Sequence, residues 1–278
     1  MQTVIDQRFS GVAYALGEAA FEYLQQSHVC VIGLGGVGSW VVEGLARSGV
    51  GALTLVDLDD ICITNVNRQI QALEHTVGQS KADVLAERVV AINPACVVTV
   101  QRSFFTKSNA EKILATKFNL VVDAIDRVEN KMELIAACVE RDLALITVGS
   151  GGDRLDPLAI AVSDLAFTLY DPLLQCVRKQ LRQKHCFPRG DKKRFSIPCV
   201  YAPKQRGPRV KACADDDLPA RKTCNDGLGS VVFMTATMGF IAVAEAVKLL
   251  SAKPTRAIYP WKNKTWYQER MQLPKSER

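Results

Sequence analysis

Paired cysteine ligands, internal repeats and low-complexity segments are all missing from this sequence. The nine cysteines are odd in number and none of them forms a CxxC pair, so the sequence favours neither a zinc site nor a disulfide framework. No signal peptide precedes them, and several fall in predicted core segments. We therefore expect reduced thiols in a cytoplasmic protein.

Acidic residues are scarce in one part of the chain. Residues 178–222 hold 14 Lys/Arg and 4 Asp/Glu, a net charge of +10, whereas the whole chain carries only +6. Such a basic block predicts a polyanionic partner, nucleic acid first, and the interleaved Phe195 and Tyr201 suit stacking on bases. The alternative is a solvated loop without a partner.

One long apolar run is present, at residues 230–250. It is about long enough to span a bilayer, but Glu245 and Lys248 interrupt it near one end. We expect a fully buried helix or a dimer-interface helix there, and association with a membrane is the less favoured alternative. The chain as a whole is 48% hydrophobic, which is ample for one sizeable core.

The most informative stretch runs from residue 28 to residue 60. An apolar strand at 29–32 leads into a glycine-rich turn, an apolar helix follows, and a second strand at 52–56 ends at Asp57. The glycines of the turn are Gly33, Gly35, Gly36 and Gly38, and Gly49 suits a helix C-terminal cap. Such a turn lets the backbone approach phosphate at a helix N-terminus, and Asp57 is placed to bind ribose hydroxyls. These features predict a nucleotide site, with NAD and ATP both open.

Polar residues gather after the second strand. Residues 61–70 include Asn65, Asn67, Arg68 and Gln69, and Arg68 can neutralise phosphate charge. Lys81 lies in the first turn of a predicted helix at 80–92, where a cation opposes the helix dipole unless an anion compensates it. We expect a phosphate to be that anion.

Carboxylates follow another buried strand, at residues 120–124, in the sequence DAID. Because strand ends in an open α/β sheet face the ligand crevice, Asp123 and Asp126 are expected to point into it. Asp126 is a candidate Mg²⁺ ligand, and its alternative role is to cap the helix predicted at 128–141.

Strands predicted at 96–101 and 144–148, and one further strand around Ile160 and Val162, complete the expected α/β fold. We predict a Rossmann-like, mostly parallel sheet with helices on both faces, a basic insertion and a C-terminal helix. A helix is expected at 14–26, a capping box at Ser108 and Glu111, and a cap at Asp171. Residues 1–254 would form a single ATP-binding domain with its insertion at about 178–222, and residues 255–278 a basic tail with Trp261 and Trp266.

Taken together, GLGGVGSW, DLDD, TNVNRQ, Lys81 and DAID resemble the E1-like (ubiquitin-activating-enzyme-like) adenylating superfamily. Within it the chain is most similar to the tRNA threonylcarbamoyladenosine dehydratases, from about residue 8 to about residue 250, including VVDAIDRVENK, DPLAIAVSDLA and TCNDGLGSVVFMTATMGF. The resemblance implies ATP-dependent cyclisation of N6-threonylcarbamoyladenosine next to the tRNA anticodon, through adenylation of its carboxylate. The alternative is an adenylating activator of a ubiquitin-like sulfur-carrier protein.

The resemblance also implies residue roles. The glycines would hold the nucleotide, Asp57 and Asp59 would contact it, Asn65, Arg68 and Lys81 would hold the phosphates, and Asp126 would coordinate Mg²⁺. Arg68, Lys81 and Asp126 are thereby the candidate catalytic residues.

Partners are implied as well: a homodimer, a cysteine desulfurase and its sulfur-acceptor protein, and a monovalent cation (Na⁺ or K⁺) whose site the sequence does not place. Two departures from the sulfur-carrier activators favour the tRNA branch: Gly11 stands where they often have arginine, and their CxxC pairs are missing. Cys224 is the best thioester candidate, although intramolecular cyclisation needs no enzyme nucleophile.

Overall fold

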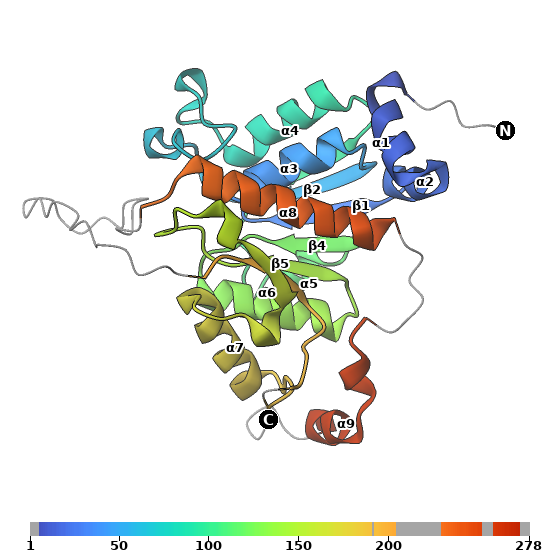
Figure 1. Cartoon of the computed structure of the whole chain (residues 1–278), viewed down its shortest axis with the longest axis vertical. Helices are drawn as coiled ribbons and strands as arrows, with labels where there is room; N and C mark the ends of the chain where they lie inside the picture. Colours follow the sequence, from blue (N-terminus) through green and yellow to red (C-terminus); the bar gives the residue numbers. More distant parts are fainter. Residues whose placement is uncertain (1–5, 191, 204–228, 252–257, 273–278) are drawn as a thin grey trace, which may run out of the picture.

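The computed structural model describes residues 6–190, 192–203, 229–251 and 258–272, without the side chains of Trp266 and Arg270 (Figure 1). The strands are β1 (His28–Ile32), β2 (Ala52–Val56), β3 (Val97–Gln101), β4 (Leu120–Asp123), β5 (Leu145–Val148), β6 (Ala161–Asp164) and β7 (Pro198–Tyr201). The helices are α1 (Ser10–Leu16), α2 (Glu18–Gln25), α3 (Gly38–Arg47), α4 (Lys81–Ile92), α5 (Ala110–Ile113), α6 (Val128–Glu140), α7 (Pro172–Lys184), α8 (Val232–Leu250) and α9 (Thr265–Gln272).

The strands form one seven-stranded sheet in the order β3-β2-β1-β4-β5-β7-β6. All neighbouring pairs are parallel except β6 with β7, so the antiparallel strand is confined to one edge. The strand order reverses between β1 and β4, which is where ligands bind in open α/β sheets. The predicted Rossmann-like, mostly parallel sheet is confirmed.

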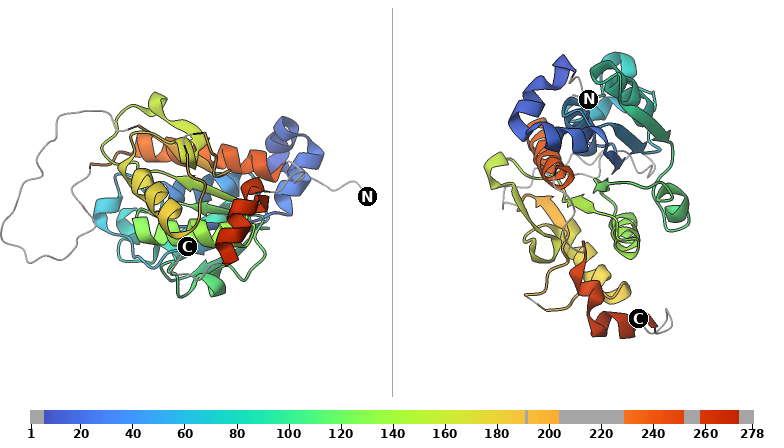
Figure 2. Two further views of the ribbon diagram at one scale, coloured as in Figure 1. Left: turned by 90° about the horizontal axis from the view of Figure 1, so that it is seen from below. Right: turned by 90° about the vertical axis from the view of Figure 1, so that its right-hand side faces the viewer.

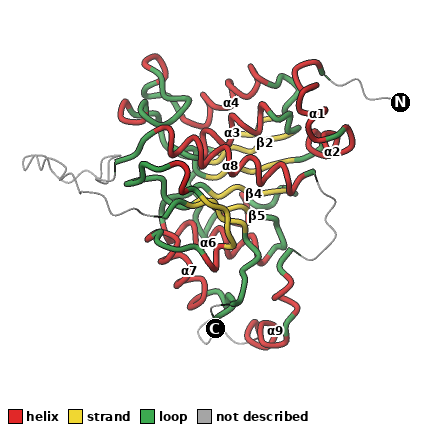
Figure 3. Tube along the Cα trace, viewed as in Figure 1, coloured by secondary structure: helices red, strands yellow, loops and turns green. Residues whose placement is uncertain are grey.

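Helices cover both faces of the sheet, as the sequence predicted (Figures 2 and 3). Val29 and Val31 of β1 pack into a core that includes α2, α3, α4 and α8. Cys30 and Ile32, the alternate residues of the same strand, pack into a core on the opposite face with α5, α6 and α7. A buried parallel strand that is apolar on both faces has this pattern.

Helix α8 packs on the sheet and on α3. Glycines permit the close approach, since a Cβ on Gly44 would lie 2.7 Å from Val243 Cγ2, and a Cβ on Gly239 would lie 2.7 Å from Trp40 Cβ. Among the described residues α8 is also the one helix long and apolar enough to cross a membrane. One side of it is buried in the fold, and Phe240 lies on the side that is exposed. The expectation of a fully buried helix is therefore met on one side only.

Two local predictions are wrong. The helix expected at 14–26 is two helices, because Gly17 between α1 and α2 has a φ of +86°, which a continuing helix cannot accommodate. The capping box at Ser108 does not form: α5 begins at Ala110 with no side-chain cap, and the Ser108 hydroxyl instead bonds Thr106 Oγ1 at 3.0 Å.

The chain near its C-terminus returns to the core beside α6 and α7. Tyr259, Trp261 and Tyr267 are buried there, in the same cluster as the side chains of those helices. In Figure 1, α9 lies at the end of the molecule farthest from α4. The described part of the predicted basic tail is thus packed against the fold, whereas the division of the chain at residue 254 remains a prediction.

Candidate nucleotide-binding site

Two of the turn glycines are required by the fold itself. Gly33 follows β1 with a φ of +90°, and a Cβ there would lie 2.7 Å from the carbonyl oxygen of Ala124, which follows β4. A Cβ on Gly38 would lie 1.8 Å from the carbonyl oxygen of Gly33. These glycines bring the ends of β1 and β4 and the start of α3 together at the point where the strand order reverses.

Gly35 has no such structural reason. The nearest atom to a Cβ on Gly35 would be Gln69 Nε2 at 4.0 Å, so the protein leaves this space open. Within the described chain, the backbone N–H groups of Gly35, Gly36 and Val37 have no acceptor. Unpaired N–H groups at the start of a helix form an anion site, and the turn therefore fits a phosphate group.

Asp57 anchors the glycine turn. Its carboxylate accepts hydrogen bonds from the backbone N–H of Leu34 at 2.6 Å and of Asp59 at 2.9 Å. Burial raises the pKa of this carboxyl, while the charge of Lys81 and the two N–H donors oppose the rise. Both carboxylate oxygens are thus engaged by the protein, and ribose binding by Asp57 remains a prediction.

Lys81 lies in the first turn of α4, as predicted, with its side chain 7% exposed. Its Nζ pairs with Asp59 Oδ2 at 2.9 Å, and the Asp59 side chain is 49% exposed. Lys81, whose charge opposes the dipole of α4, therefore has Asp59 as a counterion within the protein. A bound phosphate would be a second counterion. Sequence reasoning noted both residues but missed that they form a pair.

Arg68 lies against the glycine turn. Its Nη1 donates to the Thr64 carbonyl oxygen at 2.7 Å and to Asn67 Oδ1 at 2.9 Å, and a Cβ on Gly36 would lie 3.4 Å from Arg68 Cδ. Asn65 is buried, and its Oδ1 accepts from Cys62 N at 3.1 Å. Arg68 is therefore placed beside the phosphate-type turn, whereas Asn65 shapes the loop that carries it.

Asp126 and Asp123 have different environments. Asp126 is exposed and has no hydrogen bond or ion pair within the described residues, and it does not cap α6, whose N-cap is Arg127 without a side-chain bond. Asp123 was expected in the ligand crevice, and that prediction is wrong. Its side chain is 0% exposed, and its Oδ2 pairs with Lys131 Nζ at 2.9 Å and accepts from Thr147 Oγ1 at 2.7 Å. The buried Lys131 side chain, which the sequence pattern did not indicate, holds Asp123 in the core.

Lys131 also fixes the chain that leads to Asp126. Its Nζ donates to the carbonyl oxygens of Ile125 at 2.9 Å and Asp123 at 3.4 Å. Burial raises the pKa of the Asp123 carboxyl, and the Lys131 charge opposes this rise. No cluster of three or more His, Cys, Asp or Glu side chains that could hold a metal by themselves occurs in the described part.

The loop after β5 and the start of α8 close the site. A Cβ on Gly151 would lie 3.1 Å from Thr235 Cγ2, and a Cβ on Gly36 would lie 3.2 Å from the same atom. Asn67 Nδ2 donates to the Ser230 carbonyl oxygen at 2.8 Å. Thr235 thus joins two glycine-containing loops that are far apart in sequence, which no local pattern around it could have shown.

Arg154 and Asp171 hold the loop after β5. The buried Arg154 guanidinium donates to the carbonyl oxygen of Ala202 at 2.5 Å, to that of Gly152, and to Asp171 Oδ2 at 3.1 Å. Asp171 Oδ2 also accepts from Ser150 N at 3.0 Å, while its Oδ1 caps α7 as predicted. Arg154 was not predicted as a functional residue. In the sequence it is an isolated arginine directly after GSGGD, and nothing else marks it.

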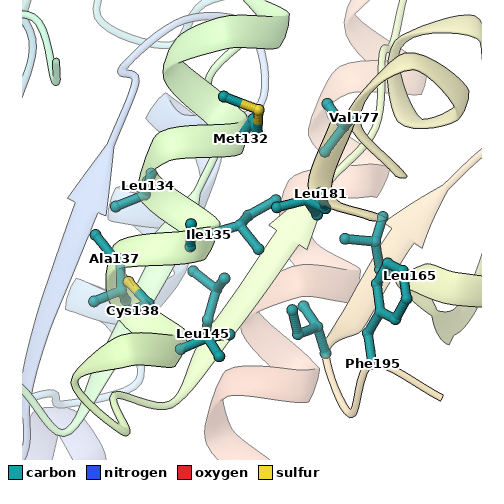
Figure 4. Close-up of a cluster of buried hydrophobic side chains, with 14 of the residues drawn as sticks. Met132, Leu134, Ile135, Ala137, Cys138, Leu145, Leu165, Val177, Leu181 and Phe195 are labelled. Carbon is teal, nitrogen blue, oxygen red and sulfur yellow. The ribbon is translucent and has the colours of Figure 1, made fainter. Parts of the chain in front are cut away.

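The aromatic side chains of the basic block do not face solvent. Phe195 is 0% and Tyr201 9% exposed, so the prediction that they stack on bases is wrong. Figure 4 shows Phe195 beside Leu165 in the cluster formed with α6 and α7. Cys199 is also buried, and burial raises the pKa of its thiol far above the usual value, which disfavours a nucleophilic role. Cys224 lies outside the described residues.

The comparisons with known proteins agree with this geometry. A family model described as the ThiF family matches residues 10–278. The tRNA threonylcarbamoyladenosine dehydratase of Escherichia coli K12 is 42% identical over 256 residues, which are 90% of this chain and 96% of that protein. The solved E. coli dehydratase in complex with ATP has a TM-score of 0.78 at 41% identity, over 89% of this chain and 97% of that chain. Its complex with AMP has a TM-score of 0.79 at 40% identity, over 92% and 100%. The chain therefore belongs to the ThiF family and, within this E1-like superfamily, to the tRNA threonylcarbamoyladenosine dehydratases.

Proposed function

We propose that this protein is an ATP-dependent enzyme that dehydrates N6-threonylcarbamoyladenosine in tRNA to its cyclic form. The observation that carries the proposal is the 42% identity to the E. coli dehydratase along 96% of that protein. It is supported by a glycine turn at the sheet's reversal point with open space at Gly35 and with Arg68 beside it. Two cations near one phosphate site suit a reaction between two anions, a carboxylate and a nucleoside triphosphate.

The proposed reaction has two steps. A carboxylate oxygen of the threonylcarbamoyl group attacks the α-phosphorus of ATP and displaces pyrophosphate. A nitrogen or the carbonyl oxygen of the carbamoyl group then attacks the activated carbonyl carbon and closes the ring, an N–H of the carbamoyl group loses its proton, and AMP leaves. Arg68 and Lys81 would offset the repulsion in the first step, and the second step needs no enzyme nucleophile.

The residues present also fit Mg²⁺. Magnesium is often held by one or two carboxylates together with phosphate oxygens and waters, rather than by an all-protein cage. Asp126 is exposed, without a partner in the described chain, and follows β4 beside the glycine turn. It would hold the ion, which would supply positive charge to the phosphates. A monovalent cation, implied by the family, has no residues assigned to it.

The direct test is to incubate the protein with Mg-ATP and tRNA that carries the threonylcarbamoyl base, and then to weigh the digested nucleoside. We expect the loss of one water, dependent on ATP and accompanied by AMP. If the mass does not change, and pyrophosphate exchange occurs only after a ubiquitin-like carrier protein is added, the proposal fails and the protein is a carrier activator.

The role of Asp126 has its own test. Substituting Asp126→Ala is expected to lower turnover at least about 100-fold, since charge stabilisation of this kind contributes on that order. The free energy of unfolding should stay within about 0.5 kcal/mol, because the side chain is exposed and has no partner. The variant is measured at several Mg²⁺ concentrations. Activity equal to that of the unmodified protein at all of them would remove Asp126 from the site.

Assembly and partners are further parts of the proposal. A homodimer is supported by a largely apolar groove of about 510 Å³ between α1 and α8, lined by Val12, Leu16, Phe240 and Val243 among others. Light scattering at several concentrations tests it, and a monomer throughout would contradict it. We further propose that the protein works with a cysteine desulfurase and its sulfur acceptor, and that it is cytoplasmic. Residues 1–254 are proposed to form one ATP-binding domain.

A further inference from the structure

Helix α7 and the loop after it form one basic surface. The helix carries four Lys/Arg and no acidic residue, with Lys179 and Lys184 exposed. Arg189, Lys192 and Arg194 are exposed in the loop at residues 185–197. Lys192 and Arg194 have no ion pair within the described residues.

Part of this charge has a structural explanation. Arg178 Nη1 donates to Thr168 Oγ1, and Arg182 donates to the Pro188 carbonyl oxygen at 3.2 Å while its guanidinium lies 5.1 Å from the Phe195 ring centre. Cations near the end of α7 also interact favourably with its dipole. Neither reason applies to Lys192 and Arg194, which lie beyond the helix and point to solvent.

Two residues of the loop at 185–197, which is described except for residue 191, have an unfavourable backbone conformation. Cys186 has a φ of +57° and Ser196 a φ of +61°, which side chains other than glycine rarely adopt. The Asp164 carboxylate accepts from the backbone N–H of Phe195 at 2.9 Å and of Ser196 at 2.7 Å. Such a conformation persists only where the surroundings hold it, and these two hydrogen bonds are part of what holds this loop.

The C-terminal segment, residues 258–272, also packs against this loop. Trp261 Nε1 donates to the Phe195 carbonyl oxygen at 2.8 Å, and the Trp261 ring centre lies 5.1 Å from that of Phe187. The segment is anchored elsewhere by Tyr259, whose hydroxyl donates to the Leu143 carbonyl oxygen at 2.7 Å, and by Lys262, which pairs with Asp142 at 2.8 Å. Figures 1 and 2 show this segment beside the end of α7.

Helix α7 and the loop after it run from the carboxyl ends of the parallel strands to their amino ends, and the basic residues begin halfway along α7, at Arg178. Helix α7 begins at Asp171, whose carboxylate binds Ser150 N next to the candidate site. The loop that follows α7 ends at Pro198, the first residue of β7, which is paired with Asp164 at the amino edge of the sheet. Basic residues occur from Arg178 to Arg194, that is, over the second half of α7 and in the loop that follows it. A row of cations of this extent suits the phosphate backbone of a helical arm of RNA better than a single nucleotide.

We propose that α7 and the loop at residues 185–197 bind the phosphate backbone of a helical arm of tRNA, and that residues 258–272 hold this loop in its binding conformation. This inference rests on the proposed function for the identity of the RNA. The recognition is by charge and does not depend on base sequence, because no described aromatic side chain of the loop is exposed.

The test compares two variants that each remove one hydrogen bond from a buried aromatic side chain to a backbone oxygen. Trp261→Phe loses the bond to Phe195 in the basic loop together with part of the indole ring that packs on Phe187, whereas Tyr259→Phe loses only the bond to Leu143, outside the loop. Affinity for whole tRNA is measured by filter binding, ATP affinity by calorimetry, and folding by thermal melting. We expect the Kd for tRNA to rise about fivefold in Trp261→Phe and less than about twofold in Tyr259→Phe, with ATP affinity unchanged in both.

A charge variant, Lys192→Gln with Arg194→Gln, tests the surface without touching the aromatic packing. We expect the slope of log Kd against log salt concentration to decrease by about 1.4 to 1.8, the value for two lost phosphate contacts. An unchanged slope would mean a solvated surface and would overturn the inference. So would equal tRNA affinities for Trp261→Phe and Tyr259→Phe. If the unmodified protein binds tRNA but leaves the nucleoside mass unchanged, the proposed function fails while this inference stands.

Discussion

The glycines of the turn differ in the space around them, and therefore in the reason why glycine is needed at each position. Gly38 cannot carry a Cβ, because that atom would lie 1.8 Å from a carbonyl oxygen, whereas the space at Gly35 is open to 4.0 Å. Gly35 is therefore the position at which the turn can be altered without altering the fold.

We expect Gly35→Ala to keep or slightly raise the free energy of unfolding, by at most about 1 kcal/mol, because alanine has less freedom in the unfolded chain. Its methyl group would occupy the proposed phosphate space and raise the Kd for ATP roughly tenfold. Calorimetric titration and thermal melting measure both quantities, and Gly38→Ala, expected not to fold stably, is the comparison. An unchanged ATP affinity would place the phosphates elsewhere.

The buried pair of Asp123 and Lys131 is the second residue-scale case. Lys131→Met would leave a carboxylate in the core without its cation, at a cost of about 3–5 kcal/mol. Adding Asp123→Asn should recover part of that loss, because an amide oxygen can still accept from Thr147. Urea unfolding gives both values. A loss below about 1 kcal/mol for Lys131→Met would show that the pair matters little for stability.

For single residues, the sequence predicted which of them lie at the site better than it predicted the contacts that each one makes. The glycines, Arg68 and Lys81 were found from spacing and charge, and the structure places Arg68 beside the turn. Asp123 and Asp126 were both expected in the crevice because both come at the end of the same strand, and only the buried Lys131 shows that Asp123 lies in the core. Phe195 and Tyr201 were predicted to stack on bases because many charged residues surround them in the sequence. That charge makes the segment look exposed, although these two side chains face the core.

Helices α3 and α4 are joined by a carboxylate between two arginines. Glu43 of α3 is buried, and its carboxylate accepts from Arg88 of α4 and from Arg47 of its own helix, each at 2.6 Å. Burial alone would raise the pKa of Glu43, but the hydrogen bonds and charges of the two arginines lower it below its usual 4.5. The ionised carboxylate therefore stabilises the packing of the two helices above that pH.

We expect Glu43→Gln to lower the free energy of unfolding by about 1–2 kcal/mol at pH 7, after allowance for the exposed arginines. Because the native pKa is depressed, this contribution is present above pH 4.5 and is lost as the pH falls through the native pKa. The difference between the two proteins should thus shrink in acid. Asp83→Asn, which breaks the exposed pair with Arg102, is the control and should change stability by less. A difference that is constant with pH would contradict the assignment.

Whole elements were predicted well where a local signal sets their ends. Asp171 caps α7 as expected, since its carboxylate supplies an oxygen that the first-turn N–H groups need, and α4 ends at Ile92 as expected before Asn93 and Pro94. The break at Gly17 was missed because an isolated glycine inside a helical pattern is tolerated and does not by itself mark the end of a helix. For α8 the fully buried alternative is wrong and the dimer-interface alternative stays a prediction, because apolar composition does not reveal which side packs in the fold.

The molecule as a whole is built from two sequence-continuous halves of one sheet. The first holds β1, β2 and β3, the second holds β4, β5, β6 and β7, and within the described residues the only strand pairing between them is β1 with β4. The alternation of strands and helices in the sequence predicts a parallel sheet of this kind. It did not predict that β5 pairs with β7, which follows α7 in the chain. The candidate nucleotide site lies on the junction between the halves.

A bound nucleotide should consequently stabilise both halves together. With a non-hydrolysable ATP analogue and Mg²⁺ at 100 times the Kd, binding adds about 2.7 kcal/mol to the free energy of unfolding. Hydrogen exchange measured by mass spectrometry should then slow in peptides that cover residues 28–38 and also in those that cover 120–126. Protection confined to one of the two stretches would contradict a site on the junction.

The single β1–β4 junction also has a consequence for synthesis on the ribosome. The first half is complete once residue 101 has been made, but the second wall of the site, after β4 and β5, requires residue 148. The second neighbour of β1 is β4, which ends at residue 123, so at about 5–20 residues per second roughly 1–4 s pass in which β1 has a neighbour on one side only. The nascent chain must keep that strand edge covered during this time, and nucleotide cannot assist until translation has passed the junction.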